Sequence, residues 1–290
     1  MTGGIDTLKL GVIGDPIGHS LSPFLHGSVI EKLGLDAVYL PYRVTGEETR
    51  RFHEAAAYMG FTGYNATMPH KIHLMDIVDE LDESARQCGS VNTVRFRDGI
   101  SRGYNTDAEG LMRALKGRGI VLPGSHVMML GAGGAAGALA RGFAAEGAGS
   151  VTILNRTEDK AASVAASIRS ENRYSTVFEA GPLSAGKMRE TAAASDIIVN
   201  CTPVGMAGVG SCFEDLSFLN ESRAFVCDLI YNPWKTDLLQ AAEDRGLAGM
   251  NGLDMLIYQG LLAFEIFTDR KLDLDGEFRR LYPLCAERLL

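Results

Sequence analysis

The chain alternates short apolar runs with longer amphipathic segments. Runs rich in β-branched residues predict strands, and apolar residues at helical spacing predict helices. Strands are expected over residues 8–13, 38–44, 61–65, 91–97, 126–130, 151–154, 196–200 and 224–230. Helices are expected over residues 23–32, 46–59, 108–116, 135–146 and 157–168. This alternation is typical of the α/β class and favours parallel sheets covered by helices.

A length of 290 residues indicates two domains, at roughly 100–200 residues per domain. A joint that contains Gly and Pro, residues 117–125, separates one expected helix from a strand that opens a new βαβ unit. Residues 252–290 predict two helices with no strand between them. We expect this tail to return to the first domain, which would then be discontinuous in sequence.

A Gly-rich turn follows the strand expected over residues 126–130. The pattern Gly131-x-Gly133-x-x-Ala136 lies between this strand and a helix of small residues. Its glycines permit a tight turn, its backbone N–H groups can approach a pyrophosphate, and the helix N-terminus favours negative charge. The pattern therefore predicts a dinucleotide site at Gly131, Ala132, Gly133, Gly134 and Ala135. The alternative is a purely structural turn.

The residues after the next strand bear on the choice of cofactor. NAD-binding sites place an acidic residue there to hold the ribose 2′-hydroxyl, whereas this chain has Asn155-Arg156-Thr157. A cationic loop with a hydroxyl suits a 2′-phosphate, and Lys160 adds charge, so NADP is expected. NAD remains an alternative because Glu158 and Asp159 follow directly. A further alternative is that Arg156 is only a solvated surface residue.

Polar clusters mark three places in the first third of the chain. Ser20 and Ser22 present two hydroxyls after the first strand, where they could bind a carboxylate or a polyol; Ser22 is alternatively the N-cap of a helix that begins at Pro23. Asn65 and Thr67 alternate along an extended segment, which places both on one side. Lys71 then lies at a helix start, an unfavourable place for a cation next to the helix dipole.

The third cluster comprises Asn92 and the segment Asn105-Thr106-Asp107. Asp107 beside Lys71 would form an ion pair that fixes the ammonium group for proton transfer. The alternative is that Asn105, Thr106 or Asp107 caps the next helix.

Composition excludes several classes of function. The net charge of −8 and a pI near 5.3 argue against nucleic acid or an anionic membrane as the main partner. Five cysteines without a CxxC pair favour free thiols and a reducing compartment. The N-terminus lacks the pattern of a signal peptide, and no apolar run is long enough to span a membrane, so a cytoplasmic protein is expected. The six histidines show no metal-binding spacing, and no metal is expected.

Taken together, these segments resemble the shikimate dehydrogenase family. The matching stretches are GDPIGHSLSP, GYNATMPHK, SVNTV, GYNTD, GAGGAA, NRT, NCTPVGM, DLIYNP and MLIYQGLLAFE, which occur in the family order between about residues 11 and 268. The resemblance implies a substrate-binding and catalytic domain of residues 1–106 plus 247–290. It also implies a Rossmann-like NADP-binding domain of residues 107–246. The implied reaction is reversible reduction of 3-dehydroshikimate to shikimate, by an oxidoreductase that acts on a CH–OH group.

The resemblance also assigns roles to residues. Lys71 and Asp107 match the catalytic pair. The implied substrate ligands are Ser20, Ser22, Asn65, Thr67, Lys71, Asn92, Asp107, Tyr231 and Gln259. Besides the Gly-rich turn, Asn155, Arg156, Thr157 and Lys160, the implied cofactor contacts are Thr202, Val204, Met206, Leu229 and Gly252.

Departures from the family pattern leave the substrate open. Asp254, near the expected nicotinamide end, is one such departure. A quinate/shikimate dehydrogenase that uses NAD or either cofactor is the close alternative. A non-catalytic dinucleotide-binding sensor is the alternative from another class. Monomer and homodimer are both compatible with the sequence.

Overall fold

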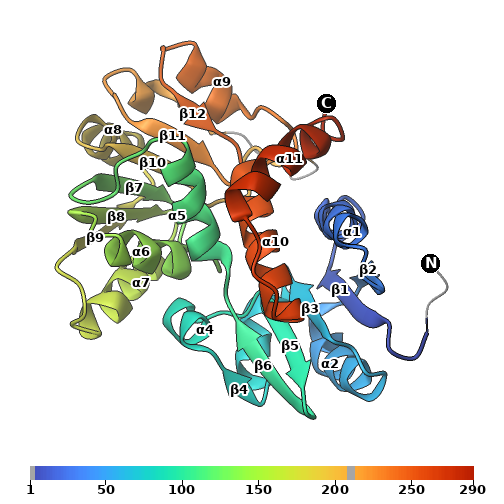
Figure 1. Cartoon of the computed structure of the whole chain (residues 1–290). Helices are drawn as coiled ribbons and strands as arrows, with labels where there is room; N and C mark the ends of the chain where they lie inside the picture. The colour runs from blue at the N-terminus through green and yellow to red at the C-terminus, as the bar shows by residue number, and fades with distance from the viewer. Residues whose placement is uncertain (1–3, 208–212) are drawn as a thin grey trace. The chain divides into compact units, whose positions relative to one another are not determined.

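In a computed structural model, described over residues 4–207 and 213–290, the chain divides into two compact units. Unit 1 comprises Met1–Gly110 and Leu256–Cys285, and unit 2 comprises Leu111–Met255 and Ala286–Leu290. The chain passes between the units at three places, each inside a helix: α5 (Asp107–Gly117), α10 (Leu253–Thr268) and the end of α11 (Leu274–Ala286) (Figure 1). The resemblance implies joints at 106/107 and 246/247, which precede α5 and α10.

Unit 1 contains a six-stranded sheet in the order β2-β1-β3-β5-β6-β4. Its strands are β1 (Leu8–Gly14), β2 (Ala37–Arg43), β3 (Gly63–Ala66), β4 (Glu80–Leu81), β5 (Thr93–Arg97) and β6 (Ile100–Tyr104). β1 pairs in parallel with β2 and β3, whereas β5 runs antiparallel to both β3 and β6. β4 is parallel to β6, so the sheet is mixed and the expectation of parallel sheets is confirmed only in part for this unit.

A tight hairpin explains the antiparallel part. Asp98 and Gly99 connect β5 to β6, both with positive φ, 52° and 78°. An Asp-Gly pair with this backbone conformation is a favoured two-residue hairpin turn, since its twist matches that of the flanking strands. The dipeptide was visible in the sequence, but β6 was not among the expected strands.

Helices cover both faces of this sheet. The helices of unit 1 are α1 (Ser22–Leu33), α2 (Thr49–Tyr58), α3 (His70–His73), α4 (Glu83–Cys88), most of α10, and α11 (Leu274–Ala286). On one face, Ile13, Tyr64 and Val94 pack with Ala56 of α2 and Ala85 of α4.

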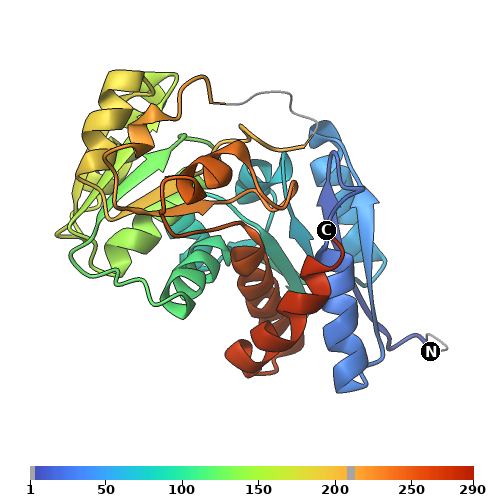
Figure 2. The same ribbon diagram turned by 90° about the horizontal axis from the view of Figure 1, so that it is seen from above.

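The C-terminal helix α11 lies beside α1 (Figures 1 and 2). Glu277 of α11 forms ion pairs with Lys32 of α1 and with Arg280. Arg280 also donates a hydrogen bond to the backbone carbonyl of Ser28. The two C-terminal helices without an intervening strand are as expected from the sequence.

Unit 2 contains a second six-stranded sheet, entirely parallel, in the order β12-β11-β10-β7-β8-β9. Its strands are β7 (His126–Leu130), β8 (Ser150–Asn155), β9 (Val177–Pro182), β10 (Ile197–Asn200), β11 (Phe225–Asp228) and β12 (Gly249–Met250). Its helices include α6 (Ala136–Ala145), α7 (Glu158–Ser170), α8 (Ala185–Ala193) and α9 (Asp237–Glu243). β9, β12, α8 and α9 were not expected from the sequence.

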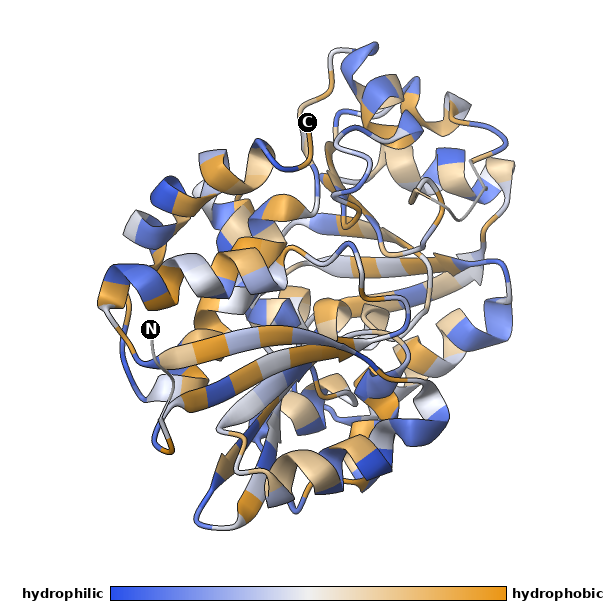
Figure 3. Ribbon diagram, turned by 90° about the vertical axis from the view of Figure 1, so that its right-hand side faces the viewer, coloured by the Kyte–Doolittle hydropathy of each residue, from blue (hydrophilic) through white to orange (hydrophobic). Residues whose placement is uncertain are grey.

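One face of this sheet packs against α8 and α9, where Met128 and Ile198 meet Met188 and Leu238. α6 and α7 pack against each other and against β8. The helices are banded orange and blue in Figure 3, the pattern of helices that turn one side to a sheet. In a parallel sheet of this kind ligands bind beyond the carboxyl ends of the strands, and the candidate cofactor residues follow those ends.

In the described part of the chain no helix is long and apolar enough to cross a membrane. Cys88, Cys201, Cys227 and Cys285 are free thiols, and Cys212 lies outside the described residues.

Candidate active site

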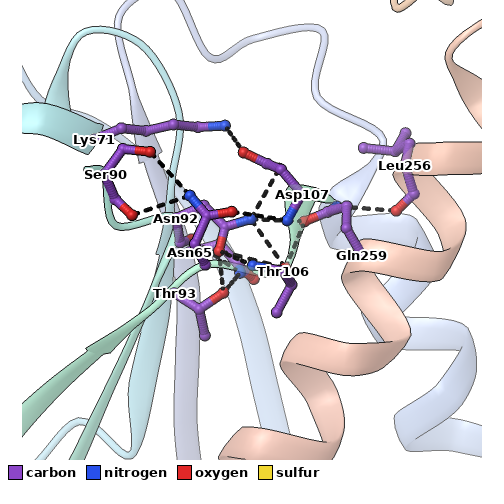
Figure 4. A network of polar contacts seen from close by, with 10 residues as sticks. Asn65, Lys71, Ser90, Asn92, Thr93, Thr106, Asp107, Leu256 and Gln259 are labelled. Carbon is purple, nitrogen blue, oxygen red and sulfur yellow. Dashed lines mark hydrogen bonds and ion pairs between the residues drawn. The ribbon is translucent and has the colours of Figure 1, made fainter. Parts of the chain in front are cut away.

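Unit 1 brings Lys71 and Asp107 together. The Lys71 ammonium lies 2.6 Å from Asp107 Oδ2, although 36 positions separate the two residues (Figure 4). The Asp107 side chain is 6% exposed and that of Lys71 21%, so the carboxylate is buried while the ammonium retains access to solvent. A charge-assisted bond of this length fixes the position of the ammonium.

Backbone contacts hold both partners of this ion pair. Asp107 opens α5, and its N–H donates to Asn105 Oδ1 at 3.0 Å. The Asp107 carboxylate is occupied instead by Lys71 and by Asn92 Nδ2, at 2.9 Å from Oδ1. The Lys71 carbonyl accepts from the Val91 N–H at 2.8 Å, which ties α3 to the segment before β5. The capping role therefore belongs to Asn105, and the alternative of Asp107 as the cap is wrong.

Amides and hydroxyls surround the ion pair. Asn92 Oδ1 accepts from the Thr106 N–H at 3.0 Å, and its Nδ2 lies 3.5 Å from Gln259 Oε1 of α10. Asn65 Nδ2 donates to Thr93 Oγ1 at 2.9 Å and to the Asn92 carbonyl at 3.2 Å. The structure therefore gathers Asn65, Asn92 and Gln259, all expected substrate ligands, around the Lys71–Asp107 pair (Figure 4).

Tyr39 is a member of this site that the sequence did not single out. Its hydroxyl donates to Asn65 Oδ1 at 2.7 Å, which fixes the orientation of that amide. Burial raises the pKa of Tyr39 well above its usual value, and a hydrogen bond with the Ser22 side chain opposes this rise. Tyr39 therefore fixes Asn65 from a buried position in β2. The alternation of β2 gave no signal for it, because a tyrosine in a strand is ordinarily a packing residue.

The alternative of Ser22 as an N-cap is wrong. α1 begins at Ser22 itself after an N-cap at Leu21 that makes no side-chain cap bond. Ser20 Oγ accepts from the Ser22 N–H at 3.3 Å, a local turn that Ser residues favour. Thr67 follows β3, and its methyl group occupies the space at Gly14, where an added Cβ would lie 2.5 Å away. Both Ser22 and Thr67 are half-buried.

The histidines in this region have structural contacts. His26 is buried and stacks on Tyr39 at a centroid distance of 4.0 Å, and burial lowers its pKa to about 3. His70 is also buried and bridges Thr49 Oγ1 and the Val44 carbonyl, at 2.7 and 2.9 Å. These contacts anchor the residue next to Lys71. In the described ranges no group of three or more His, Cys, Asp or Glu side chains is placed to hold a metal ion.

In unit 2 the Gly-rich turn lies between β7 and α6. Gly131 has a φ of 102°, and an added Cβ would lie 2.7 Å from Thr202 Cγ2, so the turn needs glycine for both conformation and space. The Ala132 N–H donates to Asn155 Oδ1 at 3.1 Å, which joins the turn to the loop after β8. Gly133 and Gly134 are exposed, with open space at the Cβ position. The turn thus presents backbone to solvent just before the N-terminus of α6.

The cationic loop is continuous with this turn. Asn155 Nδ2 donates to the Thr157 carbonyl at 2.8 Å, and Thr157 is the N-cap residue of α7. Arg156 and Lys160 are exposed. Two exposed cations thus lie at the start of α7.

Two further loops follow β10 and β11. The first carries Thr202, Val204 and Met206, and the second carries Leu229 and Tyr231, all half-buried. Gly252 touches the second loop: its N–H donates to the Ile230 carbonyl at 3.0 Å, and an added Cβ would lie only 2.0 Å from the Leu229 carbonyl oxygen. Close backbone contact thus gives Gly252 a structural reason to be glycine.

Asp254 is paired within unit 2. Its carboxylate is 2% exposed and accepts two hydrogen bonds from Arg118, Nε to Oδ1 at 2.8 Å and Nη2 to Oδ2 at 3.1 Å. The negative charge of Asp254, which departs from the family pattern, is therefore balanced by the Arg118 guanidinium group.

A Lys–Asp pair ringed by amides, together with a Gly-rich turn at the edge of a parallel sheet, defines an α/β enzyme of the dinucleotide-binding class. Comparison with known families narrows this class of enzyme to one family. The shikimate dehydrogenase substrate binding domain matches residues 12–94, shikimate / quinate 5-dehydrogenase matches residues 115–208, and the shikimate 5'-dehydrogenase C-terminal domain matches residues 252–276.

Individual proteins are also similar to the chain over most of its length. A shikimate dehydrogenase (NADP(+)) of Nitrosopumilus maritimus is 40% identical over 258 residues, which cover 88% of this chain and 91% of that protein. Shikimate 5-dehydrogenase of Listeria monocytogenes, solved with shikimate and NAD, has a TM-score of 0.85 and 34% identity, covering 97% of this chain and 98% of that one. The 5-ketofructose reductase of a Gluconobacter strain has a TM-score of 0.82 and 31% identity, covering 97% and 100%. The chain belongs to the shikimate dehydrogenase family.

Proposed function

We propose that this protein is an NADP-dependent shikimate dehydrogenase, which reversibly reduces 3-dehydroshikimate to shikimate. The observation that carries the proposal is the Lys71–Asp107 pair at 2.6 Å, set among amide and hydroxyl groups of unit 1. Shikimate is a carboxylate with several hydroxyl groups, and such a ligand needs many hydrogen-bond partners held in fixed positions. The proposed substrate ligands are Ser20, Ser22, Asn65, Thr67, Lys71, Asn92, Asp107, Tyr231 and Gln259.

Lys71 and Asp107 would carry the proton chemistry. Reduction of a ketone develops negative charge on its oxygen, and a positioned ammonium both stabilises this charge and donates a proton. Asp107 fixes Lys71 through Oδ2, while Asn92 holds Oδ1 and so prevents the carboxylate from turning away. In the reverse direction the neutral Lys71 amine would accept the hydroxyl proton.

Unit 2 would hold the cofactor, which supplies or accepts the hydride when bound. The proposed contacts to the pyrophosphate are Gly131, Ala132, Gly133, Gly134 and Ala135, whose backbone is open at Gly133 and Gly134. Asn155, Arg156, Thr157 and Lys160 would hold the 2′-phosphate, a group that guanidinium and ammonium groups bind well. Thr202, Val204, Met206, Leu229 and Gly252 would lie at the nicotinamide end. The NADP(+) in the name of the Nitrosopumilus relative supports this choice over NAD.

A turnover assay tests the proposal. Purified protein would be given shikimate or quinate, each with NADP⁺ or NAD⁺, and 5-ketofructose with NADPH, while nicotinamide absorbance is followed. We expect shikimate with NADP⁺ to give the highest kcat/KM. A higher value with quinate, or with 5-ketofructose, would assign a different substrate to the same site.

Lys71→Met is the matched variant, because methionine fills similar space without charge. We expect kcat to fall by about 10²–10⁴-fold while NADP⁺ binds normally. Lys9, an ordinary lysine of β1, provides the control: Lys9→Met should keep its activity. Dinucleotide binding without turnover of any of the substrates would favour a sensor instead of an enzyme.

A further inference from the structure

A buried polar network lies at the carboxyl ends of β10 and β11. Asp228, the last residue of β11, is fully buried. Its Oδ1 accepts from Asn200 Nδ2 at 2.9 Å and from the Ile230 N–H at 3.1 Å, and its Oδ2 accepts from the Thr236 hydroxyl at 2.6 Å. One carboxylate therefore contacts the neighbouring strand and both ends of the loop that follows its own strand.

Asn200, the last residue of β10, continues the network and is also fully buried. Its Oδ1 accepts from the Thr202 N–H at 3.0 Å and the Thr202 hydroxyl at 2.7 Å, and its Nδ2 also lies 3.3 Å from the Val204 carbonyl. Thr202 Oγ1 accepts in turn from the Val204 N–H at 3.2 Å. Asn200 therefore folds the loop after β10 back onto its own strand.

The two loops are thus joined at the strand ends by the Asn200–Asp228 contact and by the Leu229 N–H, which donates to the Asn200 carbonyl at 3.1 Å. Another link joins them further out, where the Ala207 N–H donates to the Asn232 carbonyl at 3.1 Å. Burying a carboxylate between two loops costs desolvation free energy, and apolar residues of similar volume usually stabilise a protein as well or better. Stability therefore does not explain the presence of Asp228. The candidate cofactor contacts on these two loops do explain it.

We infer that Asp228, Asn200 and Thr236 are positioning residues, which hold the loops after β10 and β11 in the arrangement that accepts the nicotinamide half of the dinucleotide. This inference rests on the proposed function, because it takes Thr202, Val204 and Leu229 as cofactor contacts. The three positioning residues would not touch the cofactor themselves. They act through the backbone of the residues that do.

From this network we predict different effects on the two halves of the cofactor. The adenosine half would be bound by the Gly-rich turn and by the loop of Arg156, which follow β7 and β8. Loosening the loops after β10 and β11 should therefore weaken NADP⁺ binding but leave 2′,5′-ADP, which lacks the nicotinamide, unaffected. General damage to unit 2 would weaken both ligands together.

The principal variant is Thr236→Val, which removes the hydroxyl that donates to Asp228 while keeping the shape of the side chain. Thr236→Ser restores the hydroxyl and serves as the rescue. Thr176→Val is the matched control, because Thr176 is also buried and donates to a carbonyl, that of Ala148 at 2.7 Å, just before β9. Asn200→Ser is the second perturbation should Thr236→Val fold poorly. Calorimetry would give Kd for NADP⁺ and for 2′,5′-ADP in each variant.

We expect Thr236→Val and Asn200→Ser to raise Kd and KM for NADP⁺ about tenfold, as loss of a buried hydrogen bond to a charged group should. The Kd for 2′,5′-ADP should stay within about twofold of the wild-type value in the same variants. Thr236→Ser and Thr176→Val should bind both ligands as wild type does. Fluorescence of Trp234, the single tryptophan of the chain, should report the change in the loop after β11.

Unchanged NADP⁺ binding in both perturbed variants would overturn the inference, and so would an equal loss of affinity for both ligands. A wild-type protein that binds NADP⁺ but turns over neither shikimate nor quinate would refute the proposed reaction and leave the positioning roles standing. A wild-type protein that binds no dinucleotide would refute both.

Discussion

Replacing Asp228 by Asn should stabilise unit 2 at neutral pH. Burial raises the pKa of the Asp228 carboxyl from 3.8 to about 6, despite hydrogen bonds from Thr236, Ile230 and Asn200 that favour the charged form. At 1.36 kcal/mol per pH unit, this rise corresponds to about 3 kcal/mol of stability lost when the group ionises in the folded protein. Asn keeps the shape of the protonated acid and never ionises.

The direction in which stability changes with pH follows from proton binding. Between pH 3.8 and about 6 the folded protein retains the Asp228 proton more than the unfolded chain does, so stability falls as pH rises through this window. Above this pH window the loss of stability is complete. The stability advantage of Asp228→Asn over wild type should therefore be smallest near pH 4 and reach about 3 kcal/mol at pH 7, with about 1 kcal/mol of the increase between pH 5 and pH 7.

Neighbouring groups do not change this window. Burial raises the pKa of the Cys201 and Cys227 thiols, which therefore stay neutral throughout it. The nearby Asp254 carboxylate is bound by Arg118 in both proteins. Since these groups are common to wild type and variant, their contributions cancel in the difference.

Urea unfolding followed by the fluorescence of Trp234, which lies in unit 2, would measure the difference at a series of pH values. Thr176→Val serves as a reference whose effect should not vary with pH in this range. A variant less stable than wild type at pH 7, or a difference that is constant with pH, would refute the reasoning. It would show that hydrogen bonds to the charged carboxylate outweigh its burial.

Three further changes test other parts of the structure. Arg156→Ala should raise KM for NADP⁺ about tenfold or more and leave KM for NAD⁺ unchanged, because only NADP⁺ carries the 2′-phosphate; equal effects on both would place Arg156 away from that phosphate. Tyr39→Phe should raise KM for shikimate several-fold, since Asn65 loses the donor that orients its amide, and unaltered shikimate kinetics would contradict this. Gly252→Ala should destabilise unit 2 by about 2 kcal/mol or more, measured by urea unfolding, because the new Cβ meets the Leu229 carbonyl; wild-type stability would mean that the backbone can shift there freely.

Much of the site could be predicted from the sequence because its residues follow strands or begin helices. The Gly-rich turn has its own local pattern, and the strand before it and the helix after it are set by short-range periodicity. Lys71 and Asp107 were expected as partners, but local reasoning left a capping role open for Asp107. Only the fold decides between the two, because it places a lysine from 36 positions earlier 2.6 Å away.

By itself the sequence determined the α/β class, the dinucleotide turn and the residues with the right chemistry, since each depends on neighbours in the chain. The tertiary structure decided what those residues contact. It turned part of the first sheet antiparallel, gave Asn65 a partner in Tyr39, and paired Asp254 with Arg118. It also joined Asn200 to Asp228 across two strands. Such contacts depend on which strands become neighbours in a sheet, and that is settled by packing of the whole unit rather than by any local stretch of sequence.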